Sequence, residues 1–319
     1  MTRHFLRDDD LAPAEQAEVL ALATQMKRAP YDHRPLAGPL TVATIYDKPT
    51  LRTQASFSSG IAELGGHSML VDGRLAGIGE REAVADVARV LGRQASAIVW
   101  RTFGQDAIEE MAAHAGVPVV NALTDDFHPC QLLADLLTVQ EHTGGLAGRT
   151  VGFVGDGACN MGNSWVLAGA TAGIHVRIGA PDGYLPDRAV VARAEQVAAA
   201  TGGSITLTHD PHEAVSGADA VVTDTWVSMG KEGESGARAA TFAPYAVTVE
   251  LFDEAADDAV LLHCLPAYRG KEVAAEVIDG PRSVVWDEAE NRRHAQKAVL
   301  TWLLAQPDET AGDGGSDHE

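Results

Sequence analysis

The segment "TVATIYDKPTLRTQASFSSGIAELGGHSMLVD" (41–72) contains the repeating unit from which we predict the fold. The apolar run at 41–46 predicts a strand, 56–66 predicts a helix that ends at its paired glycines, and 67–72 predicts a second short strand. A strand, a crossover helix and another strand are typical of parallel sheets. The polar stretch 47–54 lies between the first strand and the helix, so a polar loop follows the carboxyl end of that strand.

The same alternation continues along the chain and then restarts. A helix at 10–28 precedes the opening segment, and the first series continues with a helix at 81–93, a strand at 95–101, a helix at 105–115 and a strand at 117–123. A long amphipathic helix at 128–144 is suited to joining two domains. Further strands are predicted at 150–156, 174–181, 204–210, 220–224, 259–266 and 283–287, followed by a helix at 288–306. We therefore predict an α/β protein with two doubly wound parallel-sheet domains, joined by interdomain helices, with the active site in the cleft.

Composition narrows the class of partner and the cell compartment. The 319 residues are 45% hydrophobic and 22% charged, with a formal net charge of −21. That charge argues against nucleic acid or an anionic membrane as a partner. No apolar stretch has the length of a membrane span or a signal peptide, and the three cysteines are too widely spaced for a disulfide framework, so a reducing cytoplasm is expected. The acidic, Gly-rich end (307–319) predicts a disordered tail.

Polar clusters follow many of the predicted strands, where open α/β sheets place their ligands. Their recurrence in register with the strand–helix alternation indicates one binding cleft rather than separate polar turns. The seven clusters are "DKPTLRT", "WRTFGQ", "DDFHPCQ", "GDGACNMGNS", "TDTWVSMG", "HCLPAYRG" and "DEAENRRH".

The first of these clusters has the chemistry of an anion site. Arg52, Thr53 and the backbone N–H groups of the following helix can together hold a phosphate. Arg101, His128 and Gln131 follow other strands and supply further donors. Such a set suits a dianion together with a polarised carbonyl group.

Three other kinds of site are weakly indicated by the residues alone. "GDGACN" (155–160) resembles a dinucleotide-binding glycine turn, but Asn160 stands where the third glycine belongs. The pairs His128/Cys130 and His263/Cys264 fit no structural zinc spacing. A Cys–His nucleophile pair remains open, because sequence gives no distance between the two side chains.

Longer motifs identify a family resemblance. "FHPCQ" (127–131), "DTWVSMG" (224–230), "HCLP" (263–266) and "DEAENRRHAQKA" (287–298) resemble the aspartate/ornithine transcarbamylase superfamily. The likeness spans about residues 5–305. Ser-Met-Gly combined with His-Cys-Leu-Pro is similar to the ornithine branch, the ornithine carbamoyltransferases.

The resemblance implies domains, an assembly and substrates. It implies a carbamoyl phosphate-binding domain (1–135), an ornithine-binding domain (136–288), a C-terminal helix (289–306) that packs back on the first domain, and a homotrimer or a multiple of it. The implied substrates are carbamoyl phosphate and L-ornithine, which give L-citrulline and phosphate. No metal or organic cofactor is expected, because the leaving phosphate can take the proton of the amine.

The resemblance also implies roles for individual residues. Catalysis would rest on donors directed at the developing negative charge and on residues beside the reacting amine, namely Arg101, His128, Cys264 and Arg292. Carbamoyl phosphate would be bound by Thr50, Leu51, Arg52, Thr53, Arg101, His128 and Gln131. Ornithine would be bound by Asn160, Asp224, Ser228, Met229, Cys264 and Leu265.

The departures from the family pattern lie mainly on the phosphate side. The usual loop reads Ser-Thr-Arg-Thr-Arg, whereas here Leu51 lacks a hydroxyl and Gln54 lacks a guanidinium. Gly77 stands where a glutamine usually reaches a neighbouring subunit, and Cys159 replaces an asparagine. Loss of one charged hydrogen-bond partner costs about 1–3 kcal/mol. Four alternatives stay open: compensated drift with ordinary activity, an inhibitor-resistant isoform, transfer to a related amine, and a non-catalytic amino-acid-binding oligomer.

Overall fold

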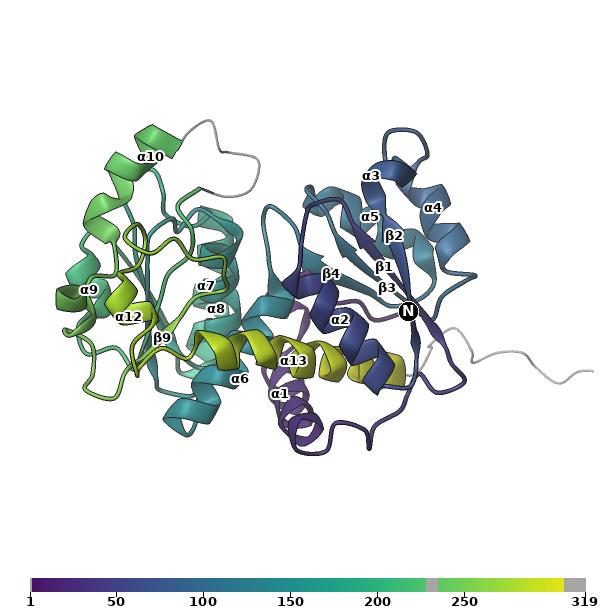
Figure 1. Cartoon of the computed structure of the whole chain (residues 1–319), viewed down its shortest axis with the longest axis horizontal. Coiled ribbons are helices and arrows are strands. Elements are labelled where there is room, and N and C mark those ends of the chain that lie inside the picture. The colour runs from purple at the N-terminus through teal and green to yellow at the C-terminus, as the bar shows by residue number, and fades with distance from the viewer. Residues whose placement is uncertain (1, 228–234, 307–319) are drawn as a thin grey trace, which may run out of the picture.

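The computed structural model describes residues 2–227 and 235–306, and it contains two parallel β-sheets with helices around them (Figure 1). The first sheet has the strand order β2-β1-β3-β4. Its strands are β1 (Thr41–Tyr46), β2 (His67–Asp72), β3 (Ala97–Arg101) and β4 (Val119–Leu123). Every pairing is parallel, so the carboxyl ends of these strands share one edge.

The second sheet has the order β7-β6-β5-β8-β9, and its pairings are also parallel. The chain adds β6 and β7 on one side of β5 and then β8 and β9 on its other side. In doubly wound sheets, ligands bind where the strand order changes direction in this way. Its strands are β5 (Thr150–Val154), β6 (His175–Gly179), β7 (Ser204–Thr208), β8 (Ala220–Val222) and β9 (Val260–Leu262).

Helices cover both faces of each sheet (Figure 1). In the first half they are η1 (Asp8–Asp10), α1 (Pro13–Arg28), α2 (Arg52–Glu63), α3 (Gly73–Ala76), α4 (Val84–Leu91), α5 (Gln105–Ala115) and α6 (Pro129–Thr143). In the second half they are α7 (Asn160–Thr171), α8 (Arg188–Thr201), α9 (Pro211–Val215), α10 (Ser235–Phe242), η3 (Ala243–Tyr245), α11 (Val249–Phe252), α12 (Ala275–Ile278) and α13 (Val285–Ala305).

One hydrophobic core joins the two halves. It includes side chains from both sheets and from α1, α6, α7 and α13. Figure 1 shows α13 running from the second sheet toward α1 and α2 of the first half, beside α6. Lys297 of α13 donates to Glu63 Oε2 at the end of α2 (2.6 Å) and to the carbonyl of Pro30 (2.8 Å). The C-terminal helix therefore links the second sheet to the first half of the chain.

Most predicted strands appear at or within their predicted bounds, but the prediction for 283–287 is wrong. There Ser283 forms only an isolated bridge to Leu261, and α13 begins at Val285. The two β-branched valines of "SVVWD" favour a strand, and packing of the helix in the core overrides that local preference.

Two predictions near the opening segment also need correction. The helix predicted at 56–66 runs from Arg52 to Glu63, so the polar loop forms its first turn. The Gly-rich stretch after β2 contains the short helix α3, which was not predicted. The prediction of a disordered tail at 307–319 falls outside the described residues. Within the described residues, no helix is long and apolar enough to cross a membrane.

Candidate active site

The site is built around the hydroxyl group of Thr53, in the first turn of α2. Its oxygen accepts hydrogen bonds from Arg101 Nη1 (3.3 Å) and from Arg292 Nη2 (2.8 Å). Arg101 ends β3 and Arg292 lies on α13, and all three residues are buried. Segments far apart in the sequence thus bring two guanidinium groups to one hydroxyl oxygen.

No carboxylate neutralises these guanidinium groups. Within residues 2–227 and 235–306, neither Arg101 nor Arg292 forms an ion pair, and the Nε atom of each is buried without a hydrogen-bond partner. Burial, and then the charge of Arg292, lowers the pKa of Arg101 to about 10, so Arg101 is still a cation at neutral pH. Buried cations that lack a counter-charge indicate a site for an anion.

Gln131 holds the guanidinium group of Arg292 through a hydrogen bond. Its Oε1 accepts a hydrogen bond from Arg292 Nη1, while its Nε2 donates to Asp135 Oδ1 (2.8 Å) and to Glu288 Oε1 (3.0 Å). The side chain is completely buried on α6. Its acceptor therefore faces the guanidinium, and its donors face two carboxyl groups.

His128, at the start of α6, is buried and uncharged. Burial, reinforced by Arg292 and Arg101, lowers its pKa well below the ordinary value. Its backbone N–H donates to Ser164 Oγ (2.9 Å), and no group in the described chain bonds Nδ1. A neutral imidazole can donate or accept a hydrogen bond here but cannot supply a charge near pH 7.

Arg52 connects the two halves of the molecule. At the start of α2, it donates through Nη2 to the backbone oxygen of Leu265 (2.5 Å), in the loop after β9. Leu265 has φ of 58°, an unusual value for a residue with a side chain, and its N–H donates to His263 Nδ1 (2.9 Å). Strained residues of this kind cost about 1–3 kcal/mol and cluster at functional sites.

Asp224 and Cys264 lie side by side after strands β8 and β9. Cys264 Sγ donates to Asp224 Oδ1 at 3.2 Å. Burial, and then the charge of Asp224, raises the pKa of Cys264 well above the ordinary value, so the thiol stays protonated. This argues against Cys264 as a thiolate nucleophile. Asn160, at the start of α7, donates from Nδ2 to the carbonyl of Thr124 (2.8 Å).

A metal site at Asp224, His263 and Cys264 is disfavoured by their hydrogen bonds. The three residues place one potential ligand atom each within 4.8 Å of the others. However, His263 Nδ1 accepts from Leu265, and Nε2 faces Glu272 Oε1 at 3.4 Å. Neither nitrogen therefore has a free lone pair, and the thiol of Cys264 is protonated.

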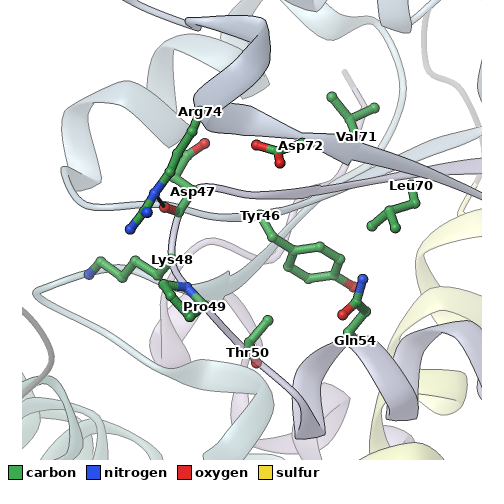
Figure 2. Close-up of a pocket in the computed structure, with 10 residues that line it drawn as sticks. All are labelled: Tyr46, Asp47, Lys48, Pro49, Thr50, Gln54, Leu70, Val71, Asp72 and Arg74. Atoms are coloured by element: carbon green, nitrogen blue, oxygen red, sulfur yellow. Dashed lines mark hydrogen bonds between the residues drawn. The ribbon is translucent and has the colours of Figure 1, made fainter.

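Leu51 and Gln54, the two residues of the loop that differ from the family pattern, lie away from the buried guanidinium groups of Arg101 and Arg292. Leu51 is 76% exposed, and Gln54 lines a pocket of about 240 Å³. Figure 2 shows Gln54 beside the ring of Tyr46, and Thr50 and Lys48 also line that pocket. Gly77 ends α3 with φ of 63°, a left-handed conformation that suits glycine.

Some site residues were missed by the sequence reasoning or cannot be placed. Ser228 and Met229 fall outside the described residues. Asp135 and Glu288 were not predicted, although Asp135 stands four residues after Gln131 and so on the same helix face. Lys48 was also missed; it is buried against Asp125 (2.5 Å) and the ring of Phe103.

The site can be compared with known proteins. Residues 3–141 match the family described as "Aspartate/ornithine carbamoyltransferase, carbamoyl-P binding domain", and residues 147–303 match its "Asp/Orn binding domain". An ornithine carbamoyltransferase of Clavibacter michiganensis is 66% identical over 96% of this chain and 100% of its own length. One from Leifsonia xyli is 59% identical over 98% of this chain and 100% of its own length.

A solved structure agrees with these matches. The ornithine carbamoyltransferase of Pyrococcus furiosus superimposes with a TM-score of 0.92 at 42% identity, covering 96% of this chain and 98% of that one. Both family matches together span nearly all of the described chain, and the relatives are matched along their full length. The chain belongs to the aspartate/ornithine carbamoyltransferase family.

Proposed function

We propose that this protein transfers the carbamoyl group of carbamoyl phosphate to the δ-amine of L-ornithine, yielding L-citrulline and phosphate. The observation that carries the proposal is the pair of buried, uncompensated guanidinium groups at Thr53. Family membership supplies the reaction class, and the relatives described as ornithine carbamoyltransferases supply the acceptor.

Carbamoyl phosphate is assigned to the Thr53 end of the site. Arg52, Thr53 and Arg101 hold the phosphate, and the first-turn N–H groups of α2 add to its stabilisation. Thr50 and Leu51 flank this turn. His128, uncharged, hydrogen-bonds the carbamoyl group, and Gln131 acts on that group through its hydrogen bond with Arg292. The cationic surroundings of Thr53 support this assignment.

Ornithine is assigned to the loops after β5, β8 and β9. Asp224 pairs with the α-ammonium group, and Asn160 contacts the α-carboxylate. Ser228 and Met229 complete this end by resemblance to the family. Cys264 and the backbone at Leu265 lie by the reacting δ-amine. The Asp224–Cys264 contact keeps two groups assigned to ornithine side by side, and the Arg52–Leu265 bond joins this end of the site to the Thr53 end; both contacts support this order.

The reaction needs orientation and charge stabilisation more than proton transfer. The uncharged δ-amine attacks the carbamoyl carbon; a C–N bond forms, and negative charge develops on the carbonyl oxygen. Arg101, His128 and Arg292 donate to that oxygen, which lowers the barrier. The C–O bond to phosphate then breaks, and the departing phosphate takes the proton of the amine. Fixing ornithine at its α-carbon brings the amine to the carbon in the correct geometry.

We also propose that residues 1–135 bind carbamoyl phosphate, residues 136–288 bind ornithine, and the chain self-associates as a homotrimer or a multiple of it. Exposed apolar side chains near the Figure 2 pocket support self-association: Leu51, Leu70 and Leu75 are 76%, 58% and 81% exposed. Contact with a neighbouring chain would remove this apolar surface from water, which favours association.

The proposal is tested with a panel of amines. Purified protein is incubated with carbamoyl phosphate and with L-ornithine, N-acetylornithine, diaminobutyrate or lysine, and ureido product and released phosphate are both measured. We expect equal amounts of citrulline and phosphate with ornithine, and at least tenfold lower kcat/KM for the others. A different preferred amine would change the assigned acceptor, and no ureido product with any amine would refute transfer itself.

A further inference from the structure

Two acidic residues of the site have no part in the chemistry proposed above. Asp135 on α6 and Glu288 on α13 are both buried, and one oxygen of each carboxyl group accepts a hydrogen bond from the same nitrogen, Gln131 Nε2 (2.8 and 3.0 Å). Two carboxylates at this separation, out of water, would repel each other strongly. The two carboxyl groups can therefore lie this close together only if they share a proton or if a cation forms an ion pair with them.

No cation is dedicated to the pair. Within the described residues, neither carboxyl group forms an ion pair, and Asp135 Oδ2 has no donor. Arg292 is close enough to favour ionisation of both groups, but its two terminal nitrogens donate to Gln131 and Thr53. The remaining way to stabilise two adjacent buried carboxyl groups is one shared proton, as in other close carboxyl pairs.

The pair is joined directly to the arginine cluster through Gln131. The two hydrogens of Gln131 Nε2 go to Asp135 Oδ1 (2.8 Å) and Glu288 Oε1 (3.0 Å), and its Oε1 accepts from Arg292. If the amide were reversed, its NH₂ would face the guanidinium and its oxygen would face two acceptors. The carboxyl pair thus selects one of the two orientations of Gln131, and that orientation holds Arg292 against Thr53.

We propose that Asp135 and Glu288 share one proton and act as positioning residues that fix Gln131 and, through it, Arg292. The positioning role rests on the proposed function, whereas the shared proton does not. The pair also reaches the second half of the molecule, since Glu288 Oε2 accepts the backbone N–H of His263 (2.8 Å), next to Cys264. One buried pair therefore touches the supports of both ends of the site.

The charged and titratable groups around the pair agree with a single proton. Burial raises the pKa of Asp135 to about 7 and that of Glu288 well above its ordinary value. Two charged groups act on the pair: Arg292 on α13 favours ionisation, and Asp224 after β8 opposes it. The loop after β9 adds Cys264, which stays protonated, and His263, whose ring faces Glu272. Because both pKa values are raised, the pair retains a proton at a pH where an exposed carboxyl pair would be fully ionised.

Infrared spectroscopy tests the proton without any assay of activity. In wild-type protein near pH 8 we expect the C=O stretch of a protonated carboxyl group that is shielded from solvent exchange. Glu288→Gln and Asp135→Asn each remove one of the two groups that share the proton, so each should shift or remove that band. Glu290→Gln is the matched control, because Glu290 lies on the same helix but is half exposed. A band that is absent from wild type, or that is unchanged in frequency and intensity in both variants, would overturn the shared proton.

Kinetics test the positioning role. Asp135→Asn keeps an acceptor for Gln131, so we expect kcat within about threefold of wild type. Asp135→Leu removes the acceptor and frees Gln131 to reverse, so kcat should fall by about tenfold or more while KM for ornithine stays within twofold. The kcat of Asp135→Leu is compared at matched folded fraction, measured by circular dichroism.

The outcomes separate the two claims. An unchanged kcat in Asp135→Leu would refute the positioning role. Equal losses of kcat in Asp135→Asn and Asp135→Leu would show that the hydrogen bond to Gln131 is not what positions Arg292, and this would also refute it. If wild type forms no citrulline, the proposed function and the positioning role both fail. The infrared result would still decide whether the proton is shared.

Discussion

Thr53 uses one oxygen atom to hold two buried guanidinium groups. Arg101 and Arg292 approach it from β3 and α13, and neither has an ion pair in the described part of the chain. Like charges held together in a buried place are unfavourable unless an anion joins them. At this scale, the site is a cation pair that is prepared for a ligand.

Thr53→Val tests that arrangement. The change keeps the shape of the side chain and removes the acceptor, so both guanidinium groups lose a partner and separate. We expect kcat/KM for carbamoyl phosphate to fall by about 30- to 300-fold, which corresponds to about 2–3 kcal/mol, with KM for ornithine changed less than threefold. Steady-state kinetics with each substrate varied would measure this. Thr24→Val on α1 is the control, and equal losses in both variants would contradict a special role for Thr53.

Asp135 predicts an unusual dependence of stability on pH. Its pKa is raised to about 7 in the folded protein, mainly by burial, and lies near 3.8 in the unfolded chain. Between these values the folded state binds more protons, so the free energy of unfolding falls as pH rises from about 4 to about 7. Asp135→Asn should reduce this decline, as measured by urea unfolding at several pH values. The exposed Asp258→Asn should leave it unchanged, and an unaltered slope in Asp135→Asn would contradict the prediction.

At the level of secondary-structure elements, the first residues of three helices position the side chains of the site. Arg52 opens α2, Asn160 opens α7, and His128 directly precedes α6. Each start follows a strand of a parallel sheet, so backbone N–H groups point toward the carboxyl edge. The helix starts thus place both side-chain and backbone donors at one edge.

Gly162 tests the packing of one such start. A Cβ at this position of α7 would lie 2.0 Å from the backbone oxygen of Gly157, in the turn after β5. Alanine favours helix by up to about 1 kcal/mol, but a clash with backbone outweighs this gain. We therefore expect Gly162→Ala to destabilise the protein by about 1–3 kcal/mol in thermal unfolding.

The matched control is Gly145→Ala, because no atom lies within 4 Å of the added Cβ there and its φ is not positive. It should change stability by less than about 0.5 kcal/mol. Equal stability of Gly162→Ala and wild type would show that the turn after β5 can move aside.

Periodicity and family motifs predicted most elements, but not the contacts among them. The strands at 41–46 and 67–72 were predicted at their observed bounds, because apolar runs between turn residues are a local signal. The segment 283–287 was predicted wrongly, since its β-branched residues pack as a helix start in the core. The pair Asp135–Glu288 escaped prediction because the two residues come from helices 153 positions apart in sequence; only the fold brings them together.

At the scale of the whole molecule, α13 and α6 hold the two halves at a fixed distance from each other. The Lys297–Glu63 ion pair and the Arg52–Leu265 bond cross between segments that lie over 200 residues apart. The site is therefore a property of the whole chain. Neither half contains both Thr53 and Arg292.

Self-association is tested at the same scale. Leu75 is 81% exposed on α3 and follows Arg74, which lines the pocket of Figure 2. Leu75→Glu would place a charge in the proposed interface, and we expect light scattering to show loss of the trimer, with most of the protein at the mass of one chain. Val90→Glu, at an exposed position on α4, should not change the mass. An unchanged trimer in Leu75→Glu, or a monomeric wild type, would contradict the proposed surface.

The most direct test of the account is citrulline formation by wild type and by Arg101→Leu, with carbamoyl phosphate titrated at saturating L-ornithine. We expect saturable citrulline formation by wild type. We also expect a rate at least about 100-fold lower in the variant, with a melting temperature no lower than that of wild type, because a buried cation that has no ion pair among the described residues is replaced by an apolar side chain. Absence of citrulline with wild type, or equal rates in the two proteins, would contradict it.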